Sequence, residues 1–107
     1  MNSKIKIIRD TLLKVSDNVH HYECKDKGDQ YIVWAEDSEG SSVEGDNRKE
    51  NQSIQGTIDY FTRTEFDPMV DDIQEALIEA EISFYLNSVQ YEDETKYTHY
   101  EWVWKVG

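Results

Sequence analysis

The sequence predicts a small α+β domain, and three observations support this. Two segments, 3–15 and 67–80, place apolar residues at helical spacing. Four to five further segments are rich in the alternating, β-branched and aromatic residues that are typical of strands. Seven Tyr, three Trp and three Phe in 107 residues supply enough large side chains for one core and argue against disorder. We therefore expect a single domain over residues 1–107.

The charge balance excludes several classes of protein. The net charge of −12 predicts repulsion from phosphate backbones and anionic membrane surfaces, so we expect no sequence-specific nucleic-acid binding. No apolar run approaches the roughly 20 residues that a membrane span needs. Arg9 and Asp10 interrupt the apolar N-terminal stretch too early for a signal peptide. Cys24, the one cysteine, has no partner for an internal disulfide, which favours a reducing cytosol.

The first helix is predicted over residues 3–15. Ser3 is a candidate N-cap, and 16–18 supplies polar turn residues that end the helix. One face of this helix is apolar and consists of Ile5, Ile8, Leu12 and Val15. The exposed face makes this the most basic stretch of the chain, with Lys4, Lys6, Arg9 and Lys14. The basic face is interpreted as a solvated surface or as a contact for an acidic neighbour, which an identical subunit would supply.

Two strands are expected next, at 19–24 and 31–35, with a turn at 25–29 between them. The second has apolar residues on both faces, which suggests an inner strand or a strand with one face covered by a partner. His20, His21 and Cys24 together raise the question of a metal site. Adjacent histidines on a strand point to opposite faces, and no second ligand cluster follows at zinc spacing. We expect no metal there and interpret Cys24 as a half-buried thiol.

Residues 36–52 are predicted to form a mobile loop. The segment has one apolar residue, Val43, and is too long for an ordinary hairpin connection. Its oxygen ligands Asp37, Glu39 and Glu44 superficially resemble a calcium loop, but Gly40 and Arg48 occupy the wrong positions for an EF-hand. We interpret the segment as a solvated arm that becomes ordered on a partner.

A strand over 54–61 is followed by the strongest helix start in the chain. Gly56 within the strand predicts a bulge or the close approach of another backbone. Asp67 is a candidate N-cap, and Pro68 suits the first helical position because no backbone donor is needed there. Phe66 is expected to pack at the helix entry as a partial hydrophobic staple.

The helix over 67–80 has one apolar and one acidic side. The buried stripe is Met69, Ile73, Leu77 and Ala80, with Val70 and Ala76 beside it. Between Glu65 and Glu81 there are seven acidic residues and no basic one, and the outward set is Asp71, Asp72, Glu75 and Glu79. These carboxylates lack a neighbouring His, Lys or pocket, so we interpret them as a solvated face or an electrostatic partner surface rather than as acid–base groups.

The last part of the chain is predicted to be a long hairpin with its tip at 92–96. The first strand changes phase between Leu86 and Val89, which predicts a bulge near 87–88. In the final strand one face holds Tyr100, Trp102, Trp104 and Val106. Two tryptophans on one face predict packing against the helices, with a subunit interface as the alternative.

The stretch 54–106 resembles the small tail terminator, or tail completion, proteins of long-tailed bacteriophages, especially those of phages of Gram-positive bacteria. The similar blocks are 56–62, 65–71, 73–77, 89–95 and 99–102. This resemblance implies an antiparallel sheet of four to five strands with two helices packed on it. It also implies a ring of identical subunits, commonly six, that caps the tail tube, ends tube growth and meets the head connector. Such a protein would be found in the host cytoplasm during assembly and in the virion tail.

No catalytic, cofactor-binding or metal-binding constellation is expected anywhere in the chain. No phosphate loop or nucleophile elbow is present, and the histidines have no evident partner, so we do not expect an enzyme. The alternative to the structural role is a small acidic inhibitor that imitates DNA, with the carboxylates of 65–81 taking the place of phosphates.

Overall fold

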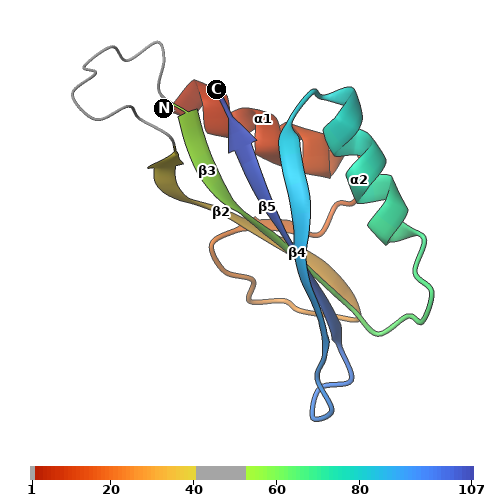
Figure 1. The fold of residues 1–107 in the computed structure, drawn as a ribbon. Coiled ribbons are helices and arrows are strands. Elements are labelled where there is room, and N and C mark those ends of the chain that lie inside the picture. The colour runs from red at the N-terminus through yellow and green to blue at the C-terminus, as the bar shows by residue number, and fades with distance from the viewer. Residues whose placement is uncertain (1, 41–52) are drawn as a thin grey trace.

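The computed structural model describes residues 2–40 and 53–107. Figure 1 shows two helices and a single twisted sheet. The elements are α1 (Asn2–Leu13), β1 (Val19–His21), β2 (Gln30–Gly40), β3 (Ser53–Thr62), α2 (Met69–Glu79), β4 (Ser83–Tyr91) and β5 (Thr98–Val106). The five strands lie in the order β1-β2-β3-β5-β4. The predicted α+β class, with four to five strands and two helices, is confirmed.

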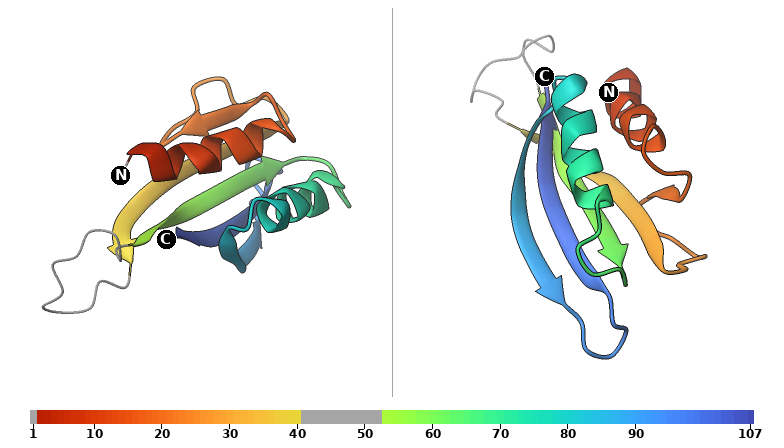
Figure 2. Two further views of the ribbon diagram at one scale, coloured as in Figure 1. Left: turned by 90° about the horizontal axis from the view of Figure 1, so that it is seen from above. Right: turned by 90° about the vertical axis from the view of Figure 1, so that its right-hand side faces the viewer.

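Both helices lie on the same face of the sheet, which we call the helix-covered face (Figure 2). The main core fills the space between them and the strands. It is built from α1, α2 and alternate residues of the strands: Ile5, Ile8, Leu12, Ile32, Trp34, Ile54, Ile58, Tyr60, Ile73, Leu77, Ile82, Trp102 and Trp104. The predicted buried faces of both helices and of β5 are therefore confirmed. The helix boundaries differ slightly: α1 already begins at Asn2, so Ser3 lies in its first turn and does not cap it.

The sheet is mixed rather than wholly antiparallel. β1 pairs in parallel with β2, with Val19 opposite Ile32 and His21 opposite Trp34. All other neighbours are antiparallel. The segment 22–29 returns the chain to the end of the sheet where β1 began, so β2 runs in the same direction as β1. A three-residue strand has too little pattern to reveal its direction from the sequence.

The expected loop at 36–52 begins later than predicted, because β2 continues to Gly40. Residues 36–40 pair with β3, with Glu36 opposite Gly56 and Gly40 opposite Ser53. The strand is formed by backbone pairing with β3, which does not depend on the side chains of β2. This explains why the polar segment 36–40 is a strand. The predicted mobility of the remainder, 41–52, concerns residues outside the described part of the chain.

Gly56 lies where another backbone approaches closely, as predicted. A Cβ atom on Gly56 would lie 2.0 Å from the Ala35 carbonyl oxygen and 2.5 Å from the Trp104 ring. β2 shifts register between Glu36 and Ser38, directly beside this point. A second register shift interrupts β4 between Leu86 and Ser88, which confirms the predicted bulge.

A smaller cluster lies on the opposite, open face of the sheet. Cys24, Tyr31 and Tyr97 are buried together, with Val33 and Phe61 packed against them. Arg63 holds this end of the molecule together: its guanidinium lies 3.1 Å from Asp29, donates 2.9 Å to the Thr95 carbonyl and covers the Tyr97 ring at 4.2 Å. The cluster therefore joins the β1–β2 connection to the tip of the β4–β5 hairpin.

Candidate interaction surface

The exposed apolar side chains gather on β4, the last strand of the sheet. Among the described residues nine large apolar side chains are exposed, and four of them are on this strand. We call these four the β4 edge: Tyr85 (58% exposed), Leu86 (44%), Val89 (50%) and Tyr91 (59%). Leu86 and Val89 lie opposite Trp102 and Tyr100 of β5, so both are on the helix-covered face. They remain exposed although α2 covers their neighbours on β5.

Phe66 is the most exposed apolar residue of the described chain. Its side chain is 92% exposed, and its backbone is in the left-handed region with φ 54°. The predicted packing of Phe66 at the start of α2 is therefore wrong. The left-handed turn directs the ring away from the helix, a conformation that a non-glycine residue adopts only rarely. The surrounding turn is held firmly, so Phe66 is an aromatic group presented to solvent.

Asp67 is what holds that turn. The residue is only 7% exposed. Its Oδ1 accepts the Met69 amide at 2.9 Å, which confirms the predicted capping of α2, and Pro68 already has helical dihedrals. Its Oδ2 accepts hydrogen bonds from Tyr60, from Thr62 at 2.7 Å and from Gln30 at 2.9 Å. Asp67 thus joins β2, β3 and α2 through one side chain.

These hydrogen bonds determine the ionisation of the Asp67 carboxyl. Burial alone would raise its pKa, but the donors Tyr60, Thr62, Met69 and Gln30 outweigh burial and hold the pKa below its ordinary value. Burial, reinforced by the hydrogen bond to Asp67, raises the pKa of the Tyr60 hydroxyl. The pair is therefore a carboxylate with a neutral phenol. It has the character of a structural junction, because every oxygen already has a donor and no described cavity opens onto it.

The two charged helix surfaces are neighbours on one face of the sheet, because α1 and α2 contact each other. Asp71, Asp72, Glu75 and Glu79 are all exposed on α2, as predicted. On α1, Arg9 is paired with Asp10 at 2.9 Å, so part of its basic charge is compensated locally. An acidic and a basic surface therefore lie side by side on the same side of the subunit.

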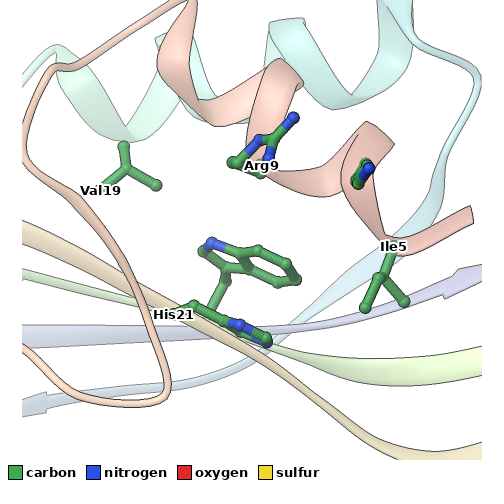
Figure 3. Close-up of a pocket in the computed structure, with 6 residues that line it drawn as sticks. Ile5, Arg9, Val19 and His21 are labelled. Carbon is green, nitrogen blue, oxygen red and sulfur yellow. The ribbon is translucent and has the colours of Figure 1, made fainter. Parts of the chain in front are cut away.

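A pocket of about 410 Å³ lies between α1 and the strands β1 and β2. Figure 3 shows it with Ile5 and Arg9 on the helix side and His21 on the strand side. The remaining lining residues are Lys6, Val19 and Trp34. Two of the polar groups already have partners, since Arg9 pairs with Asp10 and the His21 ring lies 2.6 Å from Glu36. Lys6 alone does not define an anion-binding site in this pocket.

The residues considered for metal binding do not converge. His20 and His21 are on opposite faces of β1, as predicted: His20 bonds to Asn18, and His21 stacks on Trp34 at 4.0 Å. Cys24 is buried rather than half-buried, and its thiol bonds to the Asp26 carbonyl at 3.2 Å. Within residues 2–40 and 53–107, no group of three His, Cys, Asp or Glu side chains is placed to hold a metal ion.

Two of the three oxygen ligands considered for calcium lie in a strand that the structure describes. Asp37 and Glu39 lie on β2, in extended backbone rather than in a loop. Glu44 lies outside the described residues. The candidate interaction residues that the sequence interpretation missed are those of the β4 edge. One signal was available: 82–91 is the longest stretch of the chain without Asp, Glu, Lys or Arg.

No protein family matches the chain, and no curated protein sequence matches it either. Neither helix in the described part of the chain is long and apolar enough to cross a membrane. The geometry therefore defines a class of site rather than an identity: one subunit carries an exposed apolar strand edge, an exposed aromatic turn and an acidic helix. Such features are typical of a surface that binds another protein.

Proposed function

We propose that the protein is a phage or prophage tail terminator, which caps the tail tube as a ring, ends tube growth and helps to join the tail to the head. The observation that supports this is the position of the residues that resemble that family. The blocks 56–62, 65–71 and 73–77 fall on β3, the Asp67 turn and α2, and 89–95 and 99–102 fall on β4, β5 and their connection. The resemblance thus covers one connected unit of structure.

Within that unit, residues from different blocks contact each other. Tyr60 and Thr62 of the first block donate hydrogen bonds to Asp67 of the second. Trp102 of the last block donates to Gln74 of the third at 3.0 Å. A set of residues that hold one another in place is more informative than the same number of scattered matches. The proposed role is structural and needs no catalytic group, metal or cofactor from the chain.

The partners of this role are identical subunits, the tail tube protein and the head connector. Exposed apolar residues on β4 and the exposed ring of Phe66 offer contact surfaces for proteins. Each subunit carries a net charge of −12, so DNA passing through a ring of such subunits would be repelled rather than retained. The ring, commonly of six subunits, is the expected form at the tube end and in the finished virion.

Removing the gene from the phage or prophage that carries it tests the proposal. Electron microscopy of the lysate should show tails of irregular, excessive length that are not joined to heads. Supplying the wild-type gene in trans should restore tails of normal length with heads attached. Tails of normal length joined to heads in the absence of the gene would refute the terminator role.

The acidic inhibitor remains the second candidate because of one observation. All four outward carboxylates of α2 are exposed, and no basic residue interrupts that helix. The combined variant Asp71→Asn, Asp72→Asn, Glu75→Gln and Glu79→Gln separates the two roles. A phosphate-imitating inhibitor should lose its binding to a DNA-binding partner, whereas a terminator that uses β4 and Phe66 should still complement the gene deletion.

A further inference from the structure

β4 is an edge strand without the usual protection against pairing. It lies at the end of the strand order, so no described strand pairs with its outer side. Figure 2 shows it as the outer strand of the sheet, on the side away from β2. Natural edge strands are commonly protected by charged side chains, proline, a bulge or a covering element. β4 has only the bulge between Leu86 and Ser88.

The charge pattern is the second unusual feature of this strand. The ten residues 82–91 contain no charged side chain, in a chain with 23 acidic and 11 basic residues. Two such molecules repel each other on average, because each copy has a net charge of −12. Along β4, two copies can approach without placing like charges opposite each other.

We propose that β4 pairs antiparallel with β4 of a second copy of this chain, and that this two-fold contact is the dimer of the free protein. The strand is self-complementary in one register. When Leu86 lies opposite Val89 of the partner subunit, Phe84 lies opposite Tyr91 of the partner subunit on the same face. The two-fold axis then passes beside Asn87 and Ser88. On the other side of the axis the same two pairs form again, with the roles of the two subunits exchanged.

This register agrees with the direction of every side chain along the strand. The bulge lets Leu86 and Val89 share the helix-covered face although they are three residues apart. In the paired strands each bulged Asn87 lies opposite Ser88 of the partner subunit. On the helix-covered face apolar residues therefore face apolar ones on both sides of the axis, and on the open face Tyr85 lies opposite Gln90 of the partner subunit. Pairing satisfies the outward backbone groups of β4 and covers the β4 edge. The two five-stranded sheets become one continuous sheet.

The dimer is independent of the proposed tail function. A two-fold contact closes on itself and gives two subunits, whereas a ring that caps a tube needs a head-to-tail contact. The dimer would therefore be the form of the free protein, in which β4 is covered. Failure of the tail experiment would leave this inference intact, and failure of the experiments below would leave the ring intact.

Disulfide trapping tests the register directly. Leu86→Cys and Val89→Cys are made separately in a Cys24→Ser background, so that each chain has one thiol. Opposite residues of antiparallel strands have Cα atoms about 4.5–5.5 Å apart, a distance that a disulfide spans. Mild oxidation of the two variants mixed together should give a cross-linked dimer. Each variant alone should give little, because identical positions lie about 10 Å apart along the strands.

A matched control uses the exposed residue Ile78 of α2. The Ile78→Cys variant mixed with Val89→Cys should not cross-link above the level of either alone. A mixture of Leu86→Cys and Val89→Cys that links no better than the single variants overturns the proposal. It would do so whether the chain is a monomer or associates through another surface.

Charge substitution gives an independent measurement in solution. Val89→Lys places a charge against Leu86 of the partner subunit, and we expect it to raise the dimer dissociation constant by at least about tenfold in sedimentation equilibrium. The double variant Leu86→Glu, Val89→Lys should recover the dimer, because the new carboxylate faces the new amine across the axis. Thermal unfolding checks that each variant folds. A wild-type protein that sediments as a monomer at its highest soluble concentration refutes the dimer.

Discussion

At the scale of single residues, Asp67 is the side chain on which the structure most depends. It accepts four hydrogen bonds from three elements and is nearly inaccessible to water. Asp67→Asn keeps the size but removes the charge and one acceptor. Hydrogen bonds to a charged group contribute about 1.5–3 kcal/mol each, so we expect a loss of about 2–4 kcal/mol in the free energy of unfolding. Urea denaturation followed by tryptophan fluorescence measures this loss.

The exposed Asp72 on α2 provides the control for Asp67. Asp72→Asn should change the free energy of unfolding by no more than about 0.5 kcal/mol. The two variants should also differ in their pH dependence. The pKa of Asp67 is lower in the folded state, so its stabilisation is present above the ordinary carboxyl pKa of about 4 and is lost as pH falls through the folded value. Equal losses in the two variants would contradict the role given to Asp67.

His99 has the opposite pH dependence. The Asp59 carboxylate, 2.7 Å from its ring, raises the pKa of His99 against the opposing effect of burial. The stabilisation is therefore fully present below the unfolded pKa of about 6.5 and is lost as pH rises through the folded value. We expect His99→Gln to lower the free energy of unfolding by about 0.5–1 kcal/mol near pH 6 and by less near pH 9. Asp59→Asn should remove the same pH dependence, and an equal cost at both pH values would exclude this pairing.

At the scale of secondary-structure elements, the contact of β2 with β3 depends on the absence of a side chain at Gly56. The Ala35 carbonyl oxygen belongs to the backbone and cannot move aside as a flexible side chain would. We expect Gly56→Ala to separate the strands or shift the Trp104 ring, at a cost of about 3 kcal/mol or more. Gln55→Ala, on the other face of the same strand, should cost less than about 1 kcal/mol. Urea denaturation of both variants is the measurement.

The alternation of side chains predicted much of this architecture. It identified the buried faces of β3 and β5 and the apolar stripe of α2, because each depends on apolar side chains that must leave water. The change of phase between Leu86 and Val89 also predicted the bulge in β4, although both side chains are exposed. It failed for residues 36–40, where β3 provides the pairing and the side chains contribute no pattern. The direction of β1 could not be predicted either, since it depends on how the chain returns through 22–29.

The candidate site was harder to predict than the fold, for a physical reason. Phe66 and the β4 edge are apolar and solvent-exposed, and an apolar residue in a sequence is normally assigned to the core. The left-handed backbone at Phe66 depends on the hydrogen bonds of Asp67 with β2 and β3, which are distant in sequence. Leu86 and Val89 are exposed because α2 does not reach them. The sequence of β4 does not indicate how much of the strand α2 covers.

At the scale of the whole molecule, we expect the net charge to oppose the proposed self-association. Raising the ionic strength from about 0.01 M to 0.15 M shortens the screening length from about 30 Å to about 8 Å. Because each subunit has a net charge of −12, we expect association to strengthen over this range in sedimentation experiments. The double variant Asp71→Lys, Asp72→Lys makes the net charge less negative at residues outside β4. It should therefore reduce the salt dependence of association. Association that weakens with added salt would instead indicate attraction between the basic surface of α1 and the acidic surface of α2.

The sheet also separates two natural reporter groups. Trp34, Trp102 and Trp104, the three tryptophans of the chain, are all in the main core, whereas the single thiol, Cys24, is in the small cluster with Tyr31 and Tyr97. Fluorescence therefore follows the helix-covered side, and the rate of thiol labelling follows the open side. A labelling rate that exceeds the rate expected from fluorescence-monitored unfolding would show that the small cluster opens while the main core stays closed. The unmodified protein can thus report on the two sides of its sheet independently.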